Sequence, residues 1–475
     1  MCIFVAMTQH SYRALTADEI TYFQSVLGND KVFSDNESRA HYGHDETEDL
    51  QFPPAVVLKP HTVEEVSAIL RYCNEQQIPV TPLGARTGLS GGALCVNGGV
   101  GLSMEKFNRI LKIDTLNGQV ITEPAVITQV LQEECAKQGL YYAPDPASRG
   151  SCWIGGNLAE NSGGPHAVKY GVTKDFVLNL QVVLPSGEVM WTGANTLKNS
   201  TGYNLTQLMV GSEGTLGVIT KAVLKLLPLP QHNLLMLVPF ASAEKACEAV
   251  SAVFRAGITP SAMEFMERDA IDYTMQFIDG VTIPVGDEVQ AHLLIEVDGN
   301  HLEQLMADCE KVSEIMMQFE CGEILFAEDQ AQKDQLWKVR RKVGEAVKSH
   351  SIYKEEDTVV PRYELPRLLA GVKSIGKKYG FHSVCYGHAG DGNLHVNILK
   401  GDLPDEVWHD MLPKAIREIF ELTVALGGTL SGEHGIGWVQ KHYMDIAFPY
   451  FQLELMRGIK KVFDPKGILN PGKIF

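Results

Sequence analysis

The chain has 475 residues, 45% of them hydrophobic, and a formal net charge of −17. This length allows two or three domains with cores that need no disulfides, and the negative charge argues against nucleic acid or anionic lipid as the main partner. The nine cysteines show no C-x-x-C spacing, which fits a reducing, cytoplasmic compartment and gives no sign of an iron–sulfur or zinc cluster. No apolar run reaches the length needed to cross a bilayer.

The N-terminal residues combine a short apolar run with one helix signal. The run 1–7 lacks a basic leader and a small-residue cleavage site, so we expect no signal peptide and consider both Met1 and Met7 as candidate starts. Thr16 followed by Glu19 has the pattern of a helix N-cap, and apolar positions continue the helix to residue 27. We expect residues 1–54 to form an N-terminal cap segment.

Residues 55–229 alternate short β-type runs with helical stretches, the pattern of a mixed α/β domain. We expect a helix at 63–76 and strands at 55–58, 78–81, 100–102, 118–122, 178–184, 188–192 and 218–226. Pro228 and Pro230 interrupt the pattern, so we place a domain boundary after residue 229.

Residues 230–475 indicate a second α/β layer. We expect strands at 263–265 and 292–297, and helices at 243–256, 302–319, 330–347 and 365–379. The stretch 463–475 holds several turn-forming residues and is not expected to be a helix.

Three loops of the first domain are rich in glycine: 82–92, 155–164 and 211–217. The first follows a strand and presents backbone N–H groups with little side-chain obstruction, as a pyrophosphate requires. The second sets Asn and Ser beside glycines that allow close approach of a flat ring. No loop has the G-x-G-x-x-G or Gly-Lys-Ser/Thr pattern, which disfavours the usual NAD or ATP sites. A sharp turn would explain any one loop taken alone.

Two segments of the second domain, 386–397 and 431–437, bring histidine and carboxylate together among glycines. A turn at 390–392 separates His388 from His395 and could aim both rings at one point. Glu433 would complete a two-histidine, one-carboxylate set that holds a divalent ion with open positions for substrate. His434 then stands free to move a proton, because neighbours in an extended stretch point to opposite sides. Ordinary polar residues in two Gly-rich turns are the alternative.

The order of these motifs resembles the FAD-linked 2-hydroxyacid dehydrogenases, which include the flavin subunit of glycolate oxidase, D-lactate dehydrogenases and D-2-hydroxyglutarate dehydrogenase. The resemblance covers residues 55–475 and rests on Pro82-Leu-Gly-Ala-Arg-Thr-Gly88, Pro144-Asp-Pro146, Gly155-Gly-Asn157, Ser162-Gly-Gly164, Gly211-Ser-Glu-Gly-Thr-Leu-Gly217, His388, His395, Glu433-His-Gly435 and Asn470-Pro-Gly-Lys473. It implies an α+β fold of the vanillyl-alcohol-oxidase type. A PCMH-type FAD-binding domain at 55–229 would be followed by an α/β FAD-linked oxidase C-terminal domain at 230–475, which carries substrate and metal.

The resemblance also implies which residues contact FAD. The first loop would cradle the pyrophosphate, the second would line the adenine and flavin edges, and Asn470 would reach the isoalloxazine. The implied contacts are Pro82, Gly84, Ala85, Arg86, Thr87, Gly88, Gly91, Gly92, Pro144, Asp145, Gly155, Gly156, Asn157, Asn161, Ser162, Gly163, Gly164, Tyr170, Gly171, Glu213, Gly214, Gly217, Ile219 and Asn470. Some relatives in this fold attach FAD through histidine. The first loop has none, and His166 is only near the second, so we expect non-covalent FAD.

By the same resemblance, His388, His395 and Glu433 are metal ligands for Zn, Mn or Fe, and His434 is the base. The substrate carboxylate would be held by Arg340 and Lys354, with Asn397 as a further polar contact. A solvated helix face is the alternative for Arg340, which is followed by Arg341 and Lys342. Relatives that bind a distal carboxylate carry a hydroxyl residue one turn after this arginine. Here the position is Gly344, which puts dicarboxylate specificity in doubt.

We therefore expect FAD-dependent oxidation of a small anionic D-2-hydroxy acid, D-lactate or glycolate. The alternatives are a D-2-hydroxyglutarate dehydrogenase, a non-catalytic flavin-binding scaffold, and an alkyl-glycerone-phosphate synthase, whose run of adjacent histidines is missing. The electron acceptor is left open between oxygen, a quinone, a cytochrome, an electron-transfer flavoprotein and a partner subunit. We expect a cytoplasmic protein, with attachment to the membrane through its acceptor and homodimerisation as open alternatives.

Overall fold

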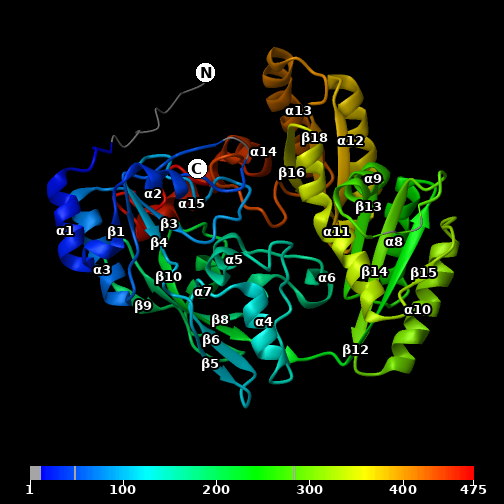
Figure 1. The fold of residues 1–475 in the computed structure, drawn as a ribbon, viewed down its shortest axis with the longest axis horizontal. Helices are drawn as coiled ribbons and strands as arrows, with labels where there is room; N and C mark the ends of the chain where they lie inside the picture. Colours follow the sequence, from blue (N-terminus) through cyan, green and yellow to red (C-terminus); the bar gives the residue numbers. More distant parts are fainter. Residues whose placement is uncertain (1–11, 48–49, 282, 284) are drawn as a thin grey trace.

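The computed structural model describes residues 12–475 apart from 48–49, 282 and 284, so both candidate starts lie outside the described residues. The chain forms two lobes side by side (Figure 1). One lobe carries the N-terminal sheets, and the other is built on a single large sheet. No helix in the described part of the chain is both long and apolar enough to span a membrane.

The first sheet has four strands in the order β1-β2-β4-β3, with β2, β4 and β3 parallel. Every residue of β2 is buried, as expected for a parallel strand covered on both faces. Helix α3 begins with a capping box, in which the Thr62 hydroxyl accepts from the Glu65 N–H at 3.2 Å. The elements are α1 (Ala17–Leu27), η1 (Asn29–Lys31), β1 (Val32–Phe33), α2 (Asn36–His41), β2 (Val56–Leu58), α3 (Val63–Gln76), β3 (Val80–Leu83) and β4 (Val100–Ser103).

The second sheet is antiparallel, in the order β5-β6-β10-β8-β9, and a small pair β11-β7 lies beside it. Its core is shared with α4 and α5 through buried residues such as Leu131, Leu158 and Leu180. The elements are β5 (Ile110–Asp114), β6 (Gln119–Thr122), α4 (Thr128–Ala136), β7 (Leu140–Tyr141), α5 (Ile154–Glu160), α6 (Ala167–Tyr170), η2 (Thr173–Phe176), β8 (Val177–Val183), β9 (Val189–Trp191), α7 (Leu205–Met209), β10 (Val218–Lys225) and β11 (Leu227–Pro228).

The other lobe is a seven-stranded antiparallel sheet in the order β15-β12-β14-β13-β17-β18-β16. One apolar core includes residues of α8, α10, α12 and α13, and a second includes residues of α9 and α11. The elements are β12 (His232–Phe240), α8 (Ala243–Arg255), β13 (Ala262–Glu267), α9 (Arg268–Phe277), β14 (Ala291–Gly299), α10 (Leu302–Met317), β15 (Leu325–Phe326), α11 (Gln330–His350), β16 (Tyr353–Val359), η3 (Arg362–Glu364), α12 (Leu365–Tyr379), β17 (His382–Gly387), η4 (Ala389–Asp391), β18 (Asn393–Leu399) and α13 (Asp405–Ala425).

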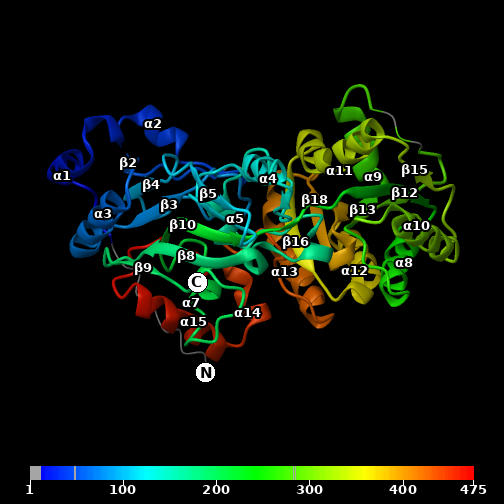
Figure 2. The same ribbon diagram turned by 90° about the horizontal axis from the view of Figure 1, so that it is seen from below.

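The C-terminal residues return to the first lobe, as both ribbon views show (Figures 1 and 2). The return runs through η5 (Lys441–Tyr443), α14 (Met444–Ala447) and α15 (Tyr450–Phe463). Beyond α15 there is no helix, as predicted, and the Asn470 N–H donates to the Val80 carbonyl at 2.7 Å. Leu469 is fully buried in the core of the first sheet. The end of the chain therefore belongs structurally with the N-terminal lobe.

Candidate active site

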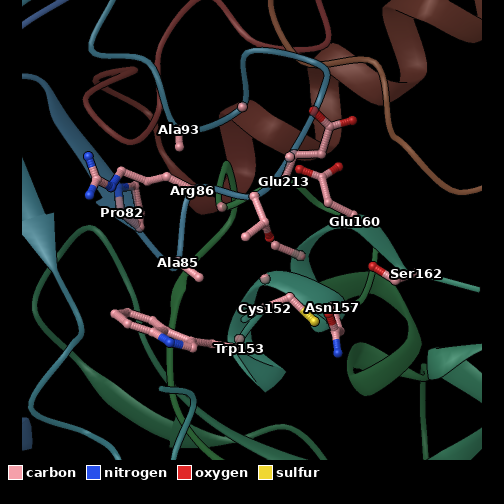
Figure 3. Close-up of a pocket in the computed structure, with 18 of the residues that line it drawn as sticks. Pro82, Ala85, Arg86, Ala93, Cys152, Trp153, Asn157, Glu160, Ser162 and Glu213 are labelled. Atoms are coloured by element: carbon pink, nitrogen blue, oxygen red, sulfur yellow. The ribbon is translucent and has the colours of Figure 1, made fainter. Parts of the chain in front are cut away.

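The three Gly-rich loops meet at one pocket in the first lobe (Figure 3). Side chains from the loop after β3, from α5 and from the turn before β10 surround it. Of the residues predicted to contact FAD, those that line it are Pro82, Gly84, Ala85, Arg86, Thr87, Gly88, Gly92, Gly155, Gly156, Asn157, Ser162, Glu213, Gly214, Gly217, Ile219 and Asn470. Trp153, Glu160 and Ser148 also line it and were not predicted.

Asn470 ties two of these loops together. Its backbone has a positive φ of 41°, and its side chain points back into the lobe. The amide Nδ2 donates to the Gly92 carbonyl at 3.0 Å and to the Glu213 carbonyl at 2.7 Å. Because both acceptors are backbone atoms of pocket loops, Asn470 fixes the pocket shape as well as lining it.

The other predicted FAD contacts lie outside the lining, and three of their side chains have protein partners. The Tyr170 hydroxyl donates to Asp298 at 2.7 Å, Asp145 pairs with His166 at 2.8 Å, and the Asn161 side chain accepts the Lys174 N–H at 2.9 Å. These polar atoms already hold loops or lobes together, and contact of the three residues with FAD stays a prediction. Also outside the lining are Gly91, Pro144, Gly163, Gly164 and Gly171.

A second set of polar side chains projects from one face of the seven-stranded sheet. In the register of β16, β18 and β17, His395 lies opposite Asp357 on one side and Tyr386 on the other. Side chains alternate along a strand, so residues two apart share a face. We define the polar face by Glu355, Asp357, Tyr386, Asn393, His395 and Asn397. His388 follows β17 directly, and its ring lies 5.4 Å from that of His395 between centroids.

Glu433 reaches this face from the 431–437 turn. Its Oε1 lies 3.1 Å from His388 Nε2 and 3.7 Å from His395 Nε2. The second Gly-rich loop comes close to the same carboxylate, since a Cβ on Gly163 would lie 3.0 Å from Glu433 Oε2. Glu433 and His434 both line the pocket of the first lobe. The polar face and the pocket are thus two sides of one site.

The donor atoms of His388, His395 and Glu433 lie within 4.8 Å of one another. Two ligand atoms that each sit about 2.1 Å from one ion lie at most about 4.2 Å apart, and the 3.1 and 3.7 Å from Glu433 Oε1 to the two Nε2 atoms fall within this limit. Imidazole with carboxylate suits Zn, Mn or Fe. Burial and the nearby His434 lower the pKa of His395 to about 3, which keeps its ring neutral as a ligand must be. The residues therefore fit a divalent ion. Glu355, His395 and His434 form an overlapping second set.

Neighbouring charges oppose the effect of burial on the pKa values of Glu433, His388 and His434. Burial alone would raise the pKa of Glu433, but the charge and hydrogen bond of His388 hold it well below its usual range. Burial would lower the pKa of His388, but Glu264 and Glu433 raise it well above its usual value. The pKa of His434 is raised against the effect of burial, chiefly by Asp357 and Glu355. The Glu433 carboxylate is thus anionic, as a ligand must be, whereas a bound cation would have to displace the proton that the neighbouring carboxylates favour on His388.

Asp357, on β16, anchors the turn that carries Glu433 and His434. Its Oδ2 accepts from the N–H of Glu433 at 2.7 Å and of His434 at 2.9 Å, and also from the Ser431 hydroxyl at 2.8 Å. Its Oδ1 accepts from Asn393 Nδ2 at 2.7 Å. This fully buried carboxylate was not predicted, although it lies in register opposite His395.

Glu264, on β13, was also missed. It is fully buried and lies 2.9 Å from His388 Nδ1, so it orients the ring whose other nitrogen faces Glu433. Arg340 lies 2.7 Å from the same carboxylate and is only 5% exposed. The solvated-face alternative for Arg340 is therefore wrong. Gly344, one turn later on α11, faces the site, since a Cβ there would lie 3.1 Å from the Tyr386 hydroxyl.

The predicted substrate contact Lys354 needs a correction. Its neighbour Glu355 belongs to the polar face, with its carboxylate 3.4 Å from His395 Nδ1 and 3.3 Å from the Tyr386 hydroxyl. Because consecutive strand residues point to opposite faces, Lys354 points away from the site. Asn397 is fully buried beside Glu355 in the register, on the site's side of the sheet.

Comparison with known proteins identifies the family to which the chain belongs. Residues 54–193 match the family described as FAD binding domain, and residues 229–474 match the one described as FAD linked oxidases, C-terminal domain. The chain is 37% identical over 473 residues to a D-lactate dehydrogenase of Anaerostipes hadrus, a match that covers 98% of this chain and 99% of that protein. The chain belongs to the FAD-linked oxidase family. It is therefore an FAD-dependent oxidoreductase, as predicted from the motifs.

Other relatives widen the range of substrates within the family. A glycolate oxidase subunit of Bacillus subtilis is 36% identical, with 97% of each chain covered, and a D-2-hydroxyglutarate dehydrogenase of Xanthomonas citri is 35% identical, with 92% of each covered. Among solved structures, p-cresol methylhydroxylase superposes with a TM-score of 0.80 at 19% identity, covering 98% of both chains. An alkyldihydroxyacetonephosphate synthase reaches 0.73 at 18% identity, covering 97% of this chain and 85% of its own. The predicted α+β fold of this type is confirmed.

Proposed function

We propose that this FAD-linked oxidase oxidises a D-2-hydroxy acid, D-lactate or glycolate, to the 2-oxo acid. The observation that carries the proposal is the position of Glu433 and His434, which line the pocket of the Gly-rich loops and also reach the polar face. A cation site, a base and a flavin pocket thereby meet at one point. The names of the relatives support the same class of substrate.

Each residue has a defined task in this proposal. His388, His395 and Glu433 hold a divalent ion, which when bound binds the substrate hydroxyl and lowers its pKa. His434 takes the hydroxyl proton, and Asp357 holds its backbone in place. The Gly-rich loops of the first lobe would hold FAD without a covalent bond, and FAD would supply the hydride acceptor for C2. Arg340, made rigid by Glu264, and Asn397 face the substrate carboxylate.

Glu355 supports a monocarboxylate as substrate. It places an acidic side chain beside His395 and Tyr386, where the distal carboxylate of 2-hydroxyglutarate would meet a like charge. Gly344 offers no hydroxyl at the neighbouring helix position. Both features disfavour a dicarboxylate.

Anaerobic bleaching of the flavin with a panel of D- and L-2-hydroxy acids tests the proposal. D-lactate or glycolate should bleach it fastest, and Glu355→Gln should raise the rate with D-2-hydroxyglutarate relative to D-lactate by about tenfold, the effect of one removed charge at short range. Glu345→Gln, an exposed change on α11, is the control and should leave the ratio unchanged. If no 2-hydroxy acid bleaches the flavin, the scaffold alternative replaces the proposal.

The mode of FAD attachment and the route of the electrons follow from the same residues. Neither candidate metal set in the described part of the chain contains a cysteine, so we infer that electrons leave the flavin directly for an external acceptor. Acid precipitation should release the flavin into solution, because His166 is held between Asp145 and Glu296. Colour that stays with the pellet would contradict non-covalent binding.

A further inference from the structure

Two acidic side chains stand together in the wall of the FAD pocket and have no task in the chemistry above. Glu160 ends α5, and Glu213 lies in the turn before β10. The Glu213 N–H donates to the Ala159 carbonyl at 2.9 Å, which holds the two segments together. Both side chains line the pocket, and Figure 3 shows their carboxylates close to one another.

The two carboxylates converge on the turn that follows His434. Gly435 has a φ of 77°, and a Cβ there would overlap Glu160 Oε2 and lie 3.1 Å from Glu213 Oε1. Glu213 accepts from the N–H of Ile436 at 2.8 Å and of Gly437 at 2.6 Å. Glu160 Oε2 is buried and finds no hydrogen-bond partner among the described residues. When two buried carboxylates lie against the same glycine and only one of them is satisfied as an anion, a proton on the pair stabilises them.

The charged surroundings favour a proton on this pair near neutral pH. Burial, then Glu213 and Asp45, raise the pKa of Glu160 well above its usual value. Burial raises the pKa of Glu213 to about 7, although two backbone N–H groups and Lys473 act in the opposite direction. Lys473 itself donates to the Asn470 side chain at 3.5 Å and so stands at the same wall. Burial of the two neighbouring carboxylates thus favours a proton on the pair.

The position of the carboxyl pair in the FAD pocket suggests a role for its proton. Gly435 directly follows His434, which lines the same pocket, so the carboxyl pair lies beside the residue that we propose as the base. A flavin that accepts a hydride gains two electrons and one proton, and its ring is left with one additional negative charge. A charge that arises beside a buried acid raises the acid's affinity for a proton.

We propose that Glu160 and Glu213 form a proton-holding pair that binds one proton from solvent each time the flavin is reduced and releases it when the flavin is reoxidised. Only an O–H bond forms and breaks on the pair, and the proton offsets the negative charge of the reduced ring. The inference rests on FAD binding and is independent of which substrate delivers the electrons.

The midpoint potential of the bound flavin, measured against reference dyes from pH 6 to pH 9, tests the pair without any hydroxy acid. The slope of the potential with pH gives the number of protons taken up with the two electrons. At pH values where the pair of the oxidised protein has lost a proton, we expect the wild-type protein to take up two protons. The double variant Glu160→Gln and Glu213→Gln should take up one, and equal slopes for the two proteins would overturn the proposal.

A control variant and a second measurement accompany this test. Glu133→Gln removes an exposed carboxylate on α4, outside the pocket, and should keep the wild-type slope. If the double variant fails to hold FAD, the infrared difference spectrum of the wild-type protein decides. Reduction at the upper end of the pH range should add the carbonyl band of a protonated carboxylic acid, and the absence of this band at every pH would overturn the proposal. A protein that no hydroxy acid reduces would still show these effects, so the substrate proposal and this one fail separately.

Discussion

The FAD pocket is lined largely by backbone and small side chains, whereas the polar face of the seven-stranded sheet is lined by ionisable groups that hold one another in place. Glycines let a large, flat cofactor approach the backbone, and Asn470 supplies the tie between loops. On the polar face Glu264 orients the ring of His388, and Asp357 holds the backbone of the turn that carries Glu433. The two regions should therefore fail independently, the first through shape and the second through charge.

Metal removal is the strongest test of this independence. Chelation should abolish hydroxy-acid oxidation and leave the flavin spectrum unchanged, because the pocket loops do not depend on the ion. Elemental analysis before and after dialysis, with activity restored by added Zn or Mn, measures the effect. Full activity in protein shown to be free of metal would remove the ion from the site.

Substitutions of the two neighbours Glu433 and His434 should have different effects on metal binding and on flavin reduction. His434→Ala should slow flavin reduction by about 10²- to 10⁴-fold, the usual effect of losing a general base, and should keep metal and FAD. Glu433→Gln should weaken metal binding instead, and added metal should restore part of the rate. Stopped-flow reduction with metal analysis distinguishes them. Because His434 also belongs to the second candidate ligand set, loss of metal from His434→Ala would show that it is a ligand.

Asp357→Asn should weaken metal binding by about 10- to 100-fold through the displaced turn, since its amide cannot accept from all the donors that Oδ2 now serves. Metal titration of both proteins measures this, and excess metal should recover part of the rate. Glu356→Gln is the matched control on the opposite face of the same strand, where Gln440 donates to Glu356 at 2.9 Å. Equal metal affinity in Asp357→Asn and wild type would mean that the carboxylate does not position the ligands.

The smallest expected effect is on stability and comes from His166, at the contact between the two lobes. His166 lies between Asp145, at 2.8 Å, and Glu296, at 3.1 Å, and these carboxylates raise its pKa well above the usual value. Since the folded-state pKa is raised, its stabilisation is fully present below the unfolded value of about 6.5 and is lost as pH rises through the folded value. His166→Gln should cost about 1.5–3 kcal/mol at pH 6 and less at pH 9. Urea unfolding at both pH values checks this, and a cost that does not depend on pH would argue against an ion pair.

The contrast between the FAD pocket and the polar face also explains which site residues could be predicted from the sequence. Glycines, histidines and Glu433 were recognisable because their chemistry is visible in short segments. Glu264 lies 124 residues from His388, and Asp357 lies 76 residues from Glu433, so only the strand register brings them together. Lys354 was assigned to the site through the resemblance alone, and β16 carries charged residues on both faces, so the strand sequence shows no alternation that would argue against it. The 229/230 domain boundary and the catalytic roles stay predictions.

The position of Asn470 also has a consequence for how the protein is made. The loops that it joins, at Gly92 and Glu213, leave the ribosome long before it does. A nascent chain that has emerged only as far as the seven-stranded sheet has all three Gly-rich loops and still lacks the residue that ties two of them. FAD should therefore be captured after translation, by a nearly complete chain, and ribosome-bound chains arrested before residue 470 should retain the cofactor poorly.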